Sequence, residues 1–180
     1  MFRTSHTHPL HIATIAVGVS GGAVGVTFAP GTFQKAAMTG PWSRDIDVDL
    51  CAIRQWGAGY LISLIEPWEF DELRIAALPE RAMAQGIKWY GLPIVDGAAP
   101  NSSFLEAWRE LGPALSNELL RGSRAVVHCK GGLGRAGRRG RGRWRRDAGR
   151  GPPRVRAAQR AAAAVAGRAA GRRDPRRAAQ

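Results

Sequence analysis

A glycine-rich loop that directly follows a short apolar strand is the feature that most constrains the fold of this 180-residue chain. The apolar run 125–127 predicts a buried strand, and the segment after it, residues 128–135, reads His-Cys-Lys-Gly-Gly-Leu-Gly-Arg. The backbone N–H groups of such a loop converge on a concavity that suits an anion, and a helix beginning near Arg135 would add its positive end. The sequence therefore predicts an anion site at the carboxyl end of a buried strand.

A cysteine and an arginine stand at the two ends of this loop. The positive field of the loop favours the thiolate of Cys129, which is the nucleophilic form of the side chain. Arg135 can bind phosphate oxygens through two parallel hydrogen bonds, a geometry that lysine does not offer. The combination is typical of a cysteine-dependent phosphatase.

Two other interpretations fit parts of the loop. Gly132, Gly134 and Gly137 match the spacing of a dinucleotide-binding fingerprint, but the acidic residue expected about 20 positions further on is missing. Cys129 could also be a buried structural cysteine, since free cysteines are often buried. Three glycines between the cysteine and the arginine favour the phosphate loop over both.

Apolar runs and helical patterns alternate along the preceding chain. The runs on either side of residues 19–22 predict an N-terminal hairpin within about residues 10–30. Later runs predict strands at 60–65, 87–94 and 123–128. Helices are expected from an N-cap at Ser43 to Gly57, over 79–85, and from a cap at Ser102 or Ser103 to Leu119, with Gly112-Pro113 kinking or dividing the last one.

This alternation predicts an α/β fold with a mostly parallel central sheet flanked by helices. In such sheets ligands bind outside the carboxyl ends of the strands. Asp96 follows the predicted strand 87–94, so it should lie at the same edge as Cys129. Transfer of a phosphoryl group to a thiolate benefits from a carboxylic acid that protonates the leaving oxygen, although an aspartate before a glycine can equally be a turn residue.

Three segments together resemble the dual-specificity branch of the protein tyrosine phosphatase superfamily, most closely the cyclin-dependent kinase inhibitor 3 group, also called kinase-associated phosphatase. They are residues 128–135, the Pro-Ile-Val-Asp-Gly segment 93–97 and the Phe-Ala-Pro-Gly segment 28–31. The resemblance spans roughly residues 10–137 and implies the fold of that group.

The resemblance implies a phosphocysteine on Cys129, with Asp96 acting first as acid and then as base. It also implies hydrolysis of phosphorylated Tyr, Ser or Thr in proteins, without a metal or another cofactor. Residues expected around the phosphoryl group are His128 as a supporting residue and, as phosphate ligands, Lys130, Gly131, Gly132, Leu133, Gly134 and Arg135. Ala136 stands where family members usually carry Ser or Thr, and this departure could slow hydrolysis of the intermediate.

The charge of the chain changes abruptly after this loop. Residues 1–135 contain equal numbers of basic and acidic residues, 12 of each, whereas residues 136–180 carry 15 Arg against 2 Asp and hence the whole net charge of +13. Those last 45 residues also hold 13 Ala, 7 Gly and 3 Pro and few large apolar side chains. We therefore divide the chain into a phosphatase-like domain, 1–137, and an Arg/Ala/Gly-rich tail, 138–180.

Three interpretations of this tail compete. A disordered basic tail could bind nucleic acid or an acidic partner. A frameshifted replacement of the last helices of the domain would leave the fold incomplete at its C-terminal end, and we favour it because the composition changes inside the catalytic motif. A divergent helix is disfavoured by the lack of apolar residues. Two alternatives to catalysis follow: a phosphoprotein-binding pseudophosphatase and a basic nucleic-acid-binding protein.

The remaining features point to a cytoplasmic protein. The apolar stretch 12–29 contains four glycines and reads as a hairpin rather than as a signal peptide or membrane helix. Two cysteines with no pairing pattern suit a reducing compartment, and no His or Cys residues stand at metal-ligand spacing. We expect a phosphorylated protein as the partner and no membrane; the oligomeric state does not follow from the sequence.

Overall fold

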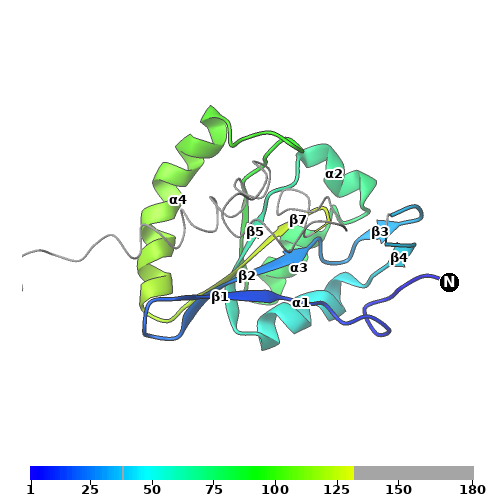
Figure 1. Cartoon of the computed structure of the whole chain (residues 1–180), viewed down its shortest axis with the longest axis horizontal. Helices are drawn as coiled ribbons and strands as arrows, with labels where there is room; N and C mark the ends of the chain where they lie inside the picture. Colours follow the sequence, from blue (N-terminus) through cyan, green and yellow to red (C-terminus); the bar gives the residue numbers. More distant parts are fainter. Residues whose placement is uncertain (38, 132–180) are drawn as a thin grey trace, which may run out of the picture.

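A five-stranded sheet forms the centre of the computed structural model, which describes residues 1–37 and 39–131. The strand order is β1-β2-β7-β5-β6 (Figure 1). β1 (Ala13–Val17) pairs antiparallel with β2 (Gly22–Phe28), which is the expected hairpin. β2, β7 (Arg124–Cys129), β5 (Ala58–Ser63) and β6 (Lys88–Gly91) then run parallel. The predicted α/β fold with a mostly parallel sheet is confirmed.

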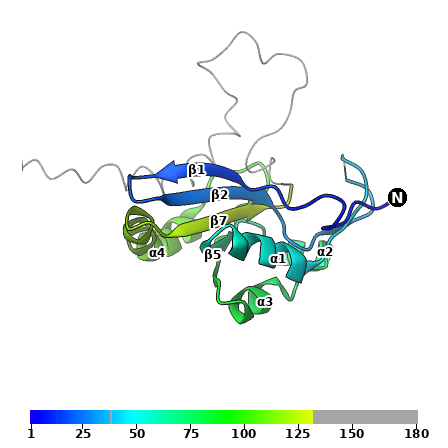
Figure 2. The same ribbon diagram turned by 90° about the horizontal axis from the view of Figure 1, so that it is seen from below.

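Helices cover both faces of this sheet, as Figures 1 and 2 show. Val126 of β7 packs among residues of α1 (Ile46–Gln55) and α3 (Leu78–Ala84), such as Leu50 and Leu78. The neighbouring Val127 packs on the other face, against α4 (Ser102–Leu120). Because alternate residues of a strand point to opposite faces, β7 is buried on both sides.

Two further elements lie near the carboxyl ends of the parallel strands. A short helix, α2 (Pro67–Glu72), follows β5, and a small two-stranded sheet is formed by β3 (Phe33–Gln34) and β4 (Trp42–Ser43). Helix α2 was not expected from the sequence. Its start is stabilised by proline at the first position and by a hydrogen bond of 2.8 Å from the backbone N–H of Glu66 to the carboxylate of Glu69.

The predicted cap of the first helix was wrong. Ser43 lies in β4, paired with Phe33, and the helix begins at Ile46 after Asp45. The Asp45 carboxylate accepts hydrogen bonds from the backbone N–H groups of Asp47 and Val48, at 2.8 and 3.0 Å. An aspartate satisfies these donors as well as a serine does, and pairing in β4 keeps the serine extended.

The start and the course of the last helix also differ from the prediction. Its N-cap is Asn101, whose Oδ1 accepts from the backbone N–H of Phe104 at 2.9 Å, rather than Ser102 or Ser103. The helix is not divided at Gly112-Pro113 but continues to Leu120. Proline removes a single backbone donor within a helix, and burial of Leu115 and Leu119 beyond it offsets that loss.

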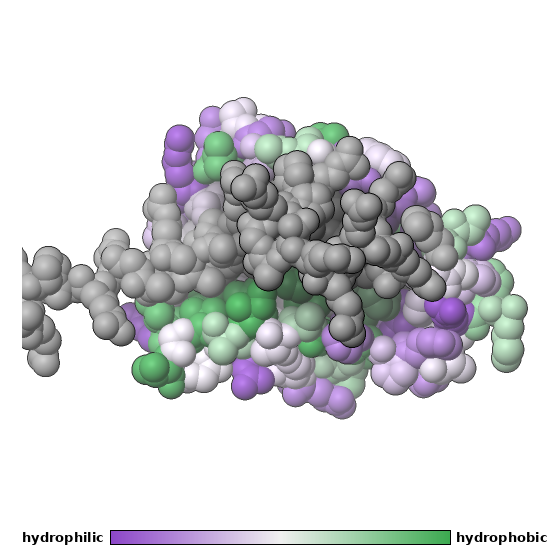
Figure 3. Space-filling view, in the orientation of Figure 1, coloured by the Kyte–Doolittle hydropathy of each residue, from purple (hydrophilic) through white to green (hydrophobic). Residues whose placement is uncertain are grey.

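The hairpin exposes some large apolar side chains. Figure 3 shows hydrophobic residues gathered between the hairpin and α4, and both Ile15 of β1 and Val19 of the following turn are exposed.

Within the part of the chain that the structure describes, no helix has the length and apolar character needed to cross a membrane. The expected end of the domain at residue 137 and the tail 138–180 lie outside the described residues.

Candidate active site

Cys129 is the last residue of β7, the middle strand of the sheet. Its side chain is almost fully buried, and its backbone lies beside Phe28, the last residue of β2. On the other side, the carbonyl of His128 accepts a hydrogen bond of 2.9 Å from the backbone N–H of Leu64, just after β5. The cysteine thus stands at the carboxyl end of a central parallel strand, where ligands of α/β sheets bind.

The residue before the cysteine is held by a buried hydrogen-bond chain. Nε2 of His128 lies 2.6 Å from Oγ of Ser63, its register partner on β5. The same hydroxyl oxygen accepts a hydrogen bond of 2.8 Å from the indole N–H of Trp89 on β6. Both Ser63 and His128 are buried. The imidazole is therefore anchored across two neighbouring strands.

The residue after the cysteine is held by α2. Nζ of Lys130 lies 2.5 Å from Oε2 of Glu72 and 5.8 Å from the ring centroid of Trp68. The carbonyl of Lys130 accepts a hydrogen bond of 3.4 Å from the backbone N–H of Ala29, which follows β2. The side chain of Lys130 is thus bound to α2, and its backbone is bound to the segment that follows β2.

A buried ion pair supports the Phe-Ala-Pro-Gly segment beside the loop. The guanidinium of Arg44 binds both carboxylate oxygens of Asp49, with Nη2 to Oδ1 at 2.7 Å and Nε to Oδ2 at 2.8 Å. Oδ2 also accepts from the backbone N–H of Gly31 at 2.9 Å. Gly31 has a φ of +75°, and a Cβ there would lie 2.1 Å from a side-chain carbon of Ile46, so glycine is required at this turn.

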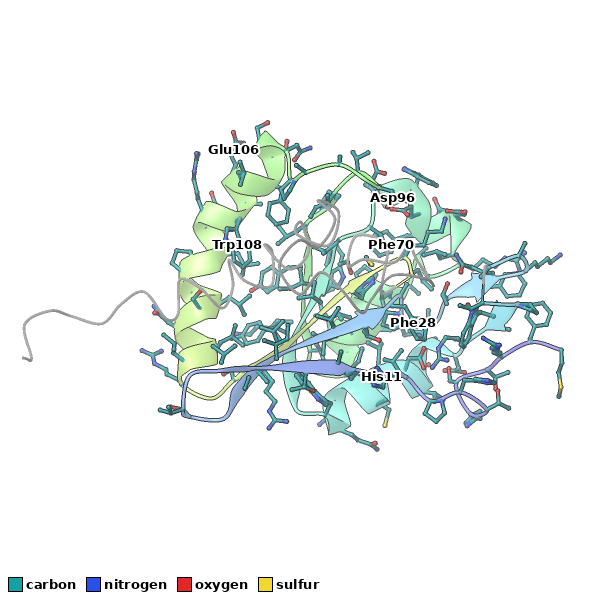
Figure 4. The ribbon with its side chains drawn as sticks, viewed as in Figure 1. His11, Phe28, Phe70, Asp96, Glu106 and Trp108 are labelled. Carbon is teal, nitrogen blue, oxygen red and sulfur yellow. The ribbon has the colours of Figure 1, made fainter. Side chains whose placement is uncertain are left out.

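Asp96 lies on the loop between β6 and α4, at the same edge of the sheet as the cysteine. The backbone N–H of Ile94 donates to the carbonyl of Leu64 at 3.0 Å, and Leu64 in turn donates to His128. Ile94 is therefore two strand spacings from His128, about 10 Å. Asp96 follows two residues later and is exposed. Figure 4 shows it above Phe70 of α2, on the side toward which β7 runs.

The described part of the predicted site consists of His128, Cys129, Lys130 and Gly131, with Asp96 at the same sheet edge. The other predicted phosphate ligands, Gly132, Leu133, Gly134 and Arg135, lie outside the described residues, and their roles stay predictions. Among residues 1–37 and 39–131, no three His, Cys, Asp or Glu side chains gather as metal ligands.

The sequence patterns do not identify several of the residues that support the site. Trp68 and Glu72 belong to α2, whose start was signalled by a proline between Glu66 and Glu69, the spacing of a capping box. Ser63 lies in an apolar run and carried no signal of its own, since its partner is 65 residues away in the sequence. Asp49 has the position of an exposed acid in the first turn of a helix, but it is buried against Arg44.

Comparison with known proteins gives a fold likeness and no sequence relative. No family profile and no curated protein match the chain. A crystal structure of kinase associated phosphatase, with its catalytic-site cysteine replaced by serine, matches with a TM-score of 0.58 at 22% identity, over 70% of this chain and 67% of that chain.

Two further solved structures match with lower scores. One is a protein described as a protein tyrosine phosphatase from Leishmania major, with a TM-score of 0.49 at 20% identity, over 70% of this chain and 72% of that chain. The other is Tk-PTP in its active form, with a TM-score of 0.42 at 20% identity, over 66% and 65%. At 22% identity, the likeness to kinase associated phosphatase is a likeness of fold alone.

Proposed function

We propose that this protein hydrolyses phosphorylated Tyr, Ser or Thr side chains of proteins through a phosphocysteine formed on Cys129. The observation that carries the proposal is the position of this cysteine at the carboxyl end of the central strand, in a fold like that of kinase associated phosphatase. Both of its neighbours in the chain are tied to other elements. Such contacts fix the position of a nucleophile whose sulfur must approach the phosphorus atom in line with the leaving oxygen.

In the first step of the proposed reaction, the Sγ thiolate of Cys129 attacks the phosphorus atom. A sulfur–phosphorus bond forms while the bond from phosphorus to the side-chain oxygen of the substrate breaks. Asp96 in its acid form donates its proton to that leaving oxygen. Arg135 and the backbone N–H groups of the loop bind the three remaining phosphoryl oxygens.

In the second step, water attacks the phosphocysteine. Asp96, now a carboxylate, accepts a proton from the water, the sulfur–phosphorus bond breaks, and inorganic phosphate leaves with regeneration of the thiolate. The proposed reaction uses no metal ion or organic cofactor. A phosphorylated protein as substrate and a cytoplasmic location are parts of the same proposal, and two unpaired cysteines are consistent with that location.

The test compares serine substitutions of the two cysteines in the full chain. Hydrolysis of an aryl phosphate is measured for the wild-type protein, for Cys129→Ser and for Cys51→Ser, whose thiol is exposed on α1. We expect loss of activity only in Cys129→Ser, together with trapping of a phosphoenzyme in the wild type on rapid acid quench. Equal rates in the two variants would refute the proposal. Phosphopeptide binding without hydrolysis by the wild type would instead identify a pseudophosphatase.

A further inference from the structure

The chain of contacts that ends at His128 begins on helix α2. The ring of Phe70 packs edge-on against Trp89, with centroids 6.2 Å apart and an angle of 75° between the planes. Trp89 donates to Ser63, and Ser63 contacts the imidazole of His128. These four side chains come from α2, β6, β5 and β7, so the contacts cross the carboxyl edge of the sheet from strand to strand.

The contact of Trp89 with Ser63 favours Ser63 as the donor in its hydrogen bond with His128. The indole N–H of Trp89 is a donor only, so it occupies one lone pair of the Ser63 oxygen. An oxygen that accepts a hydrogen bond becomes a stronger donor through its own O–H. The distance of 2.6 Å between Ser63 Oγ and His128 Nε2 is that of a close hydrogen bond between the two side chains.

We propose that Ser63 is a positioning residue for the nucleophile: its hydroxyl donates to Nε2 of His128 and thereby keeps the ring proton on Nδ1. The inference rests on the proposed function only in its catalytic consequence. The imidazole and the carbonyl of His128 are both bound to residues of the 63–64 segment, so the end of β5 holds both the side chain and the backbone of the histidine. Cys129 follows directly, and its Sγ position depends on that of His128.

Trp89 acts on the same bond from the other side. Its N–H orients the Ser63 oxygen and strengthens the donation to His128. Replacing Trp89 with phenylalanine keeps an aromatic ring against Phe70 while removing only this donor. Trp89→Phe is therefore expected to weaken the effect of Ser63 without abolishing it.

The decisive measurement is the ¹⁵N NMR spectrum of the imidazole of His128 in the full-length protein, which distinguishes the two neutral tautomers from the cation. The signal is assigned by its loss in His128→Gln. In the wild type we expect a single tautomer protonated at Nδ1. In Ser63→Ala we expect a mixture of tautomers, and in Trp89→Phe a smaller change in the same direction. The exposed His6 and His11 are internal references that should not change.

A kinetic measurement then tests the catalytic consequence. We expect kcat for an aryl phosphate to fall about 10- to 100-fold in Ser63→Ala, with little change in KM, because a misplaced nucleophile impairs attack rather than binding. Ser63→Thr, which retains a hydroxyl, should restore part of the rate. The matched control is Ser5→Ala, which removes another buried serine hydroxyl, one that binds the backbone N–H of Asp45 rather than His128.

The outcomes separate this inference from the proposed function. A proton on Nε2 in the wild type, a cationic ring, or an unchanged tautomer in both Ser63→Ala and Trp89→Phe would overturn the assignment. If Ser63→Ala does not fold, the wild-type spectrum and Trp89→Phe decide. A wild type without phosphatase activity but with the expected tautomer would refute the proposed function alone. An unchanged kcat in an active protein with altered tautomers would refute the positioning role.

Discussion

The buried pair of Arg44 and Asp49 allows the effect of a single substitution on stability to be worked out from the structure. The two side chains are 0% and 1% exposed, and the carboxylate accepts three hydrogen bonds, two from Arg44 and one from the backbone of Gly31. Asp49→Asn keeps the size of the side chain, so it creates no cavity. It removes the negative charge, however, and turns an NH₂ group toward donors.

The expected cost follows from the charge that is left behind. The guanidinium of Arg44 keeps its hydrogen bond to the carbonyl of His8, at 2.6 Å, and stays buried without a counter-ion. Breaking a buried ion pair by removing one partner costs about 3 to 5 kcal/mol. With a urea dependence of about 2 kcal/mol per M, the unfolding midpoint should fall by about 2 M. This is a large part of the stability of an ordinary domain.

Urea unfolding followed by tryptophan fluorescence measures this shift. The matched control is Asp47→Asn on the same helix, since Asp47 pairs with Arg81 at 3.2 Å while both side chains are more than half exposed. We expect that change to stay within about 0.5 kcal/mol. The double variant Arg44→Met/Asp49→Leu should unfold at a higher urea concentration than Asp49→Asn, because no buried charge is left alone. A cost below about 1 kcal/mol for Asp49→Asn would refute the reasoning.

Three further outcomes are expected. Gly22→Ala should strongly lower the melting temperature measured in a thermal scan, because a Cβ there would lie 1.8 Å from a backbone carbonyl oxygen of α4. Gly59→Ala, where a Cβ meets open space, should have little effect in the same scan. Glu72→Gln should change the urea midpoint by less than the equivalent of about 1 kcal/mol, because its ion pair with Lys130 is partly solvent-exposed. Asp96→Asn should lower turnover of an alkyl phosphate about 10²- to 10⁴-fold. The loss should be much smaller for p-nitrophenyl phosphate, because its leaving group needs no proton. Equal losses for both substrates would contradict the role of Asp96 as the acid.

The architecture was predictable because it depends on patterns along the chain. Short apolar runs separated by helical segments indicate a sheet buried on both faces, and the strand that ends at Cys129 is buried as the run 125–127 predicts. The position of Asp96 after a strand followed from the rule that parallel strands end at one edge. Both inferences need only the type and spacing of residues within a short window.

The supporting contacts were not predictable, because they join residues that are far apart in the sequence or do not match a periodic pattern. Ser63 looks like a neutral member of an apolar strand until β5 is placed beside β7. Asp49 fits a helix start equally well as an exposed acid or as the buried partner of Arg44. Its contacts with Arg44 and with the backbone of Gly31, after β2, decide between the two. Local propensity contains no information about such pairings.

Helix α2 connects the two halves of the candidate site. With six residues it is too short to be stable alone, so its position depends on tertiary contacts such as that of Phe70 with Trp89. It reaches the residue after Cys129 directly through Glu72, and the residue before Cys129 through Trp89 and Ser63. The contacts that hold Lys130 and His128, the two neighbours of Cys129, therefore both depend on α2. A shift of α2 should weaken both contacts together. The effects of substitutions at Glu72 and Ser63 should therefore be coupled rather than additive, although the two side chains do not lie in the same hydrogen-bond chain.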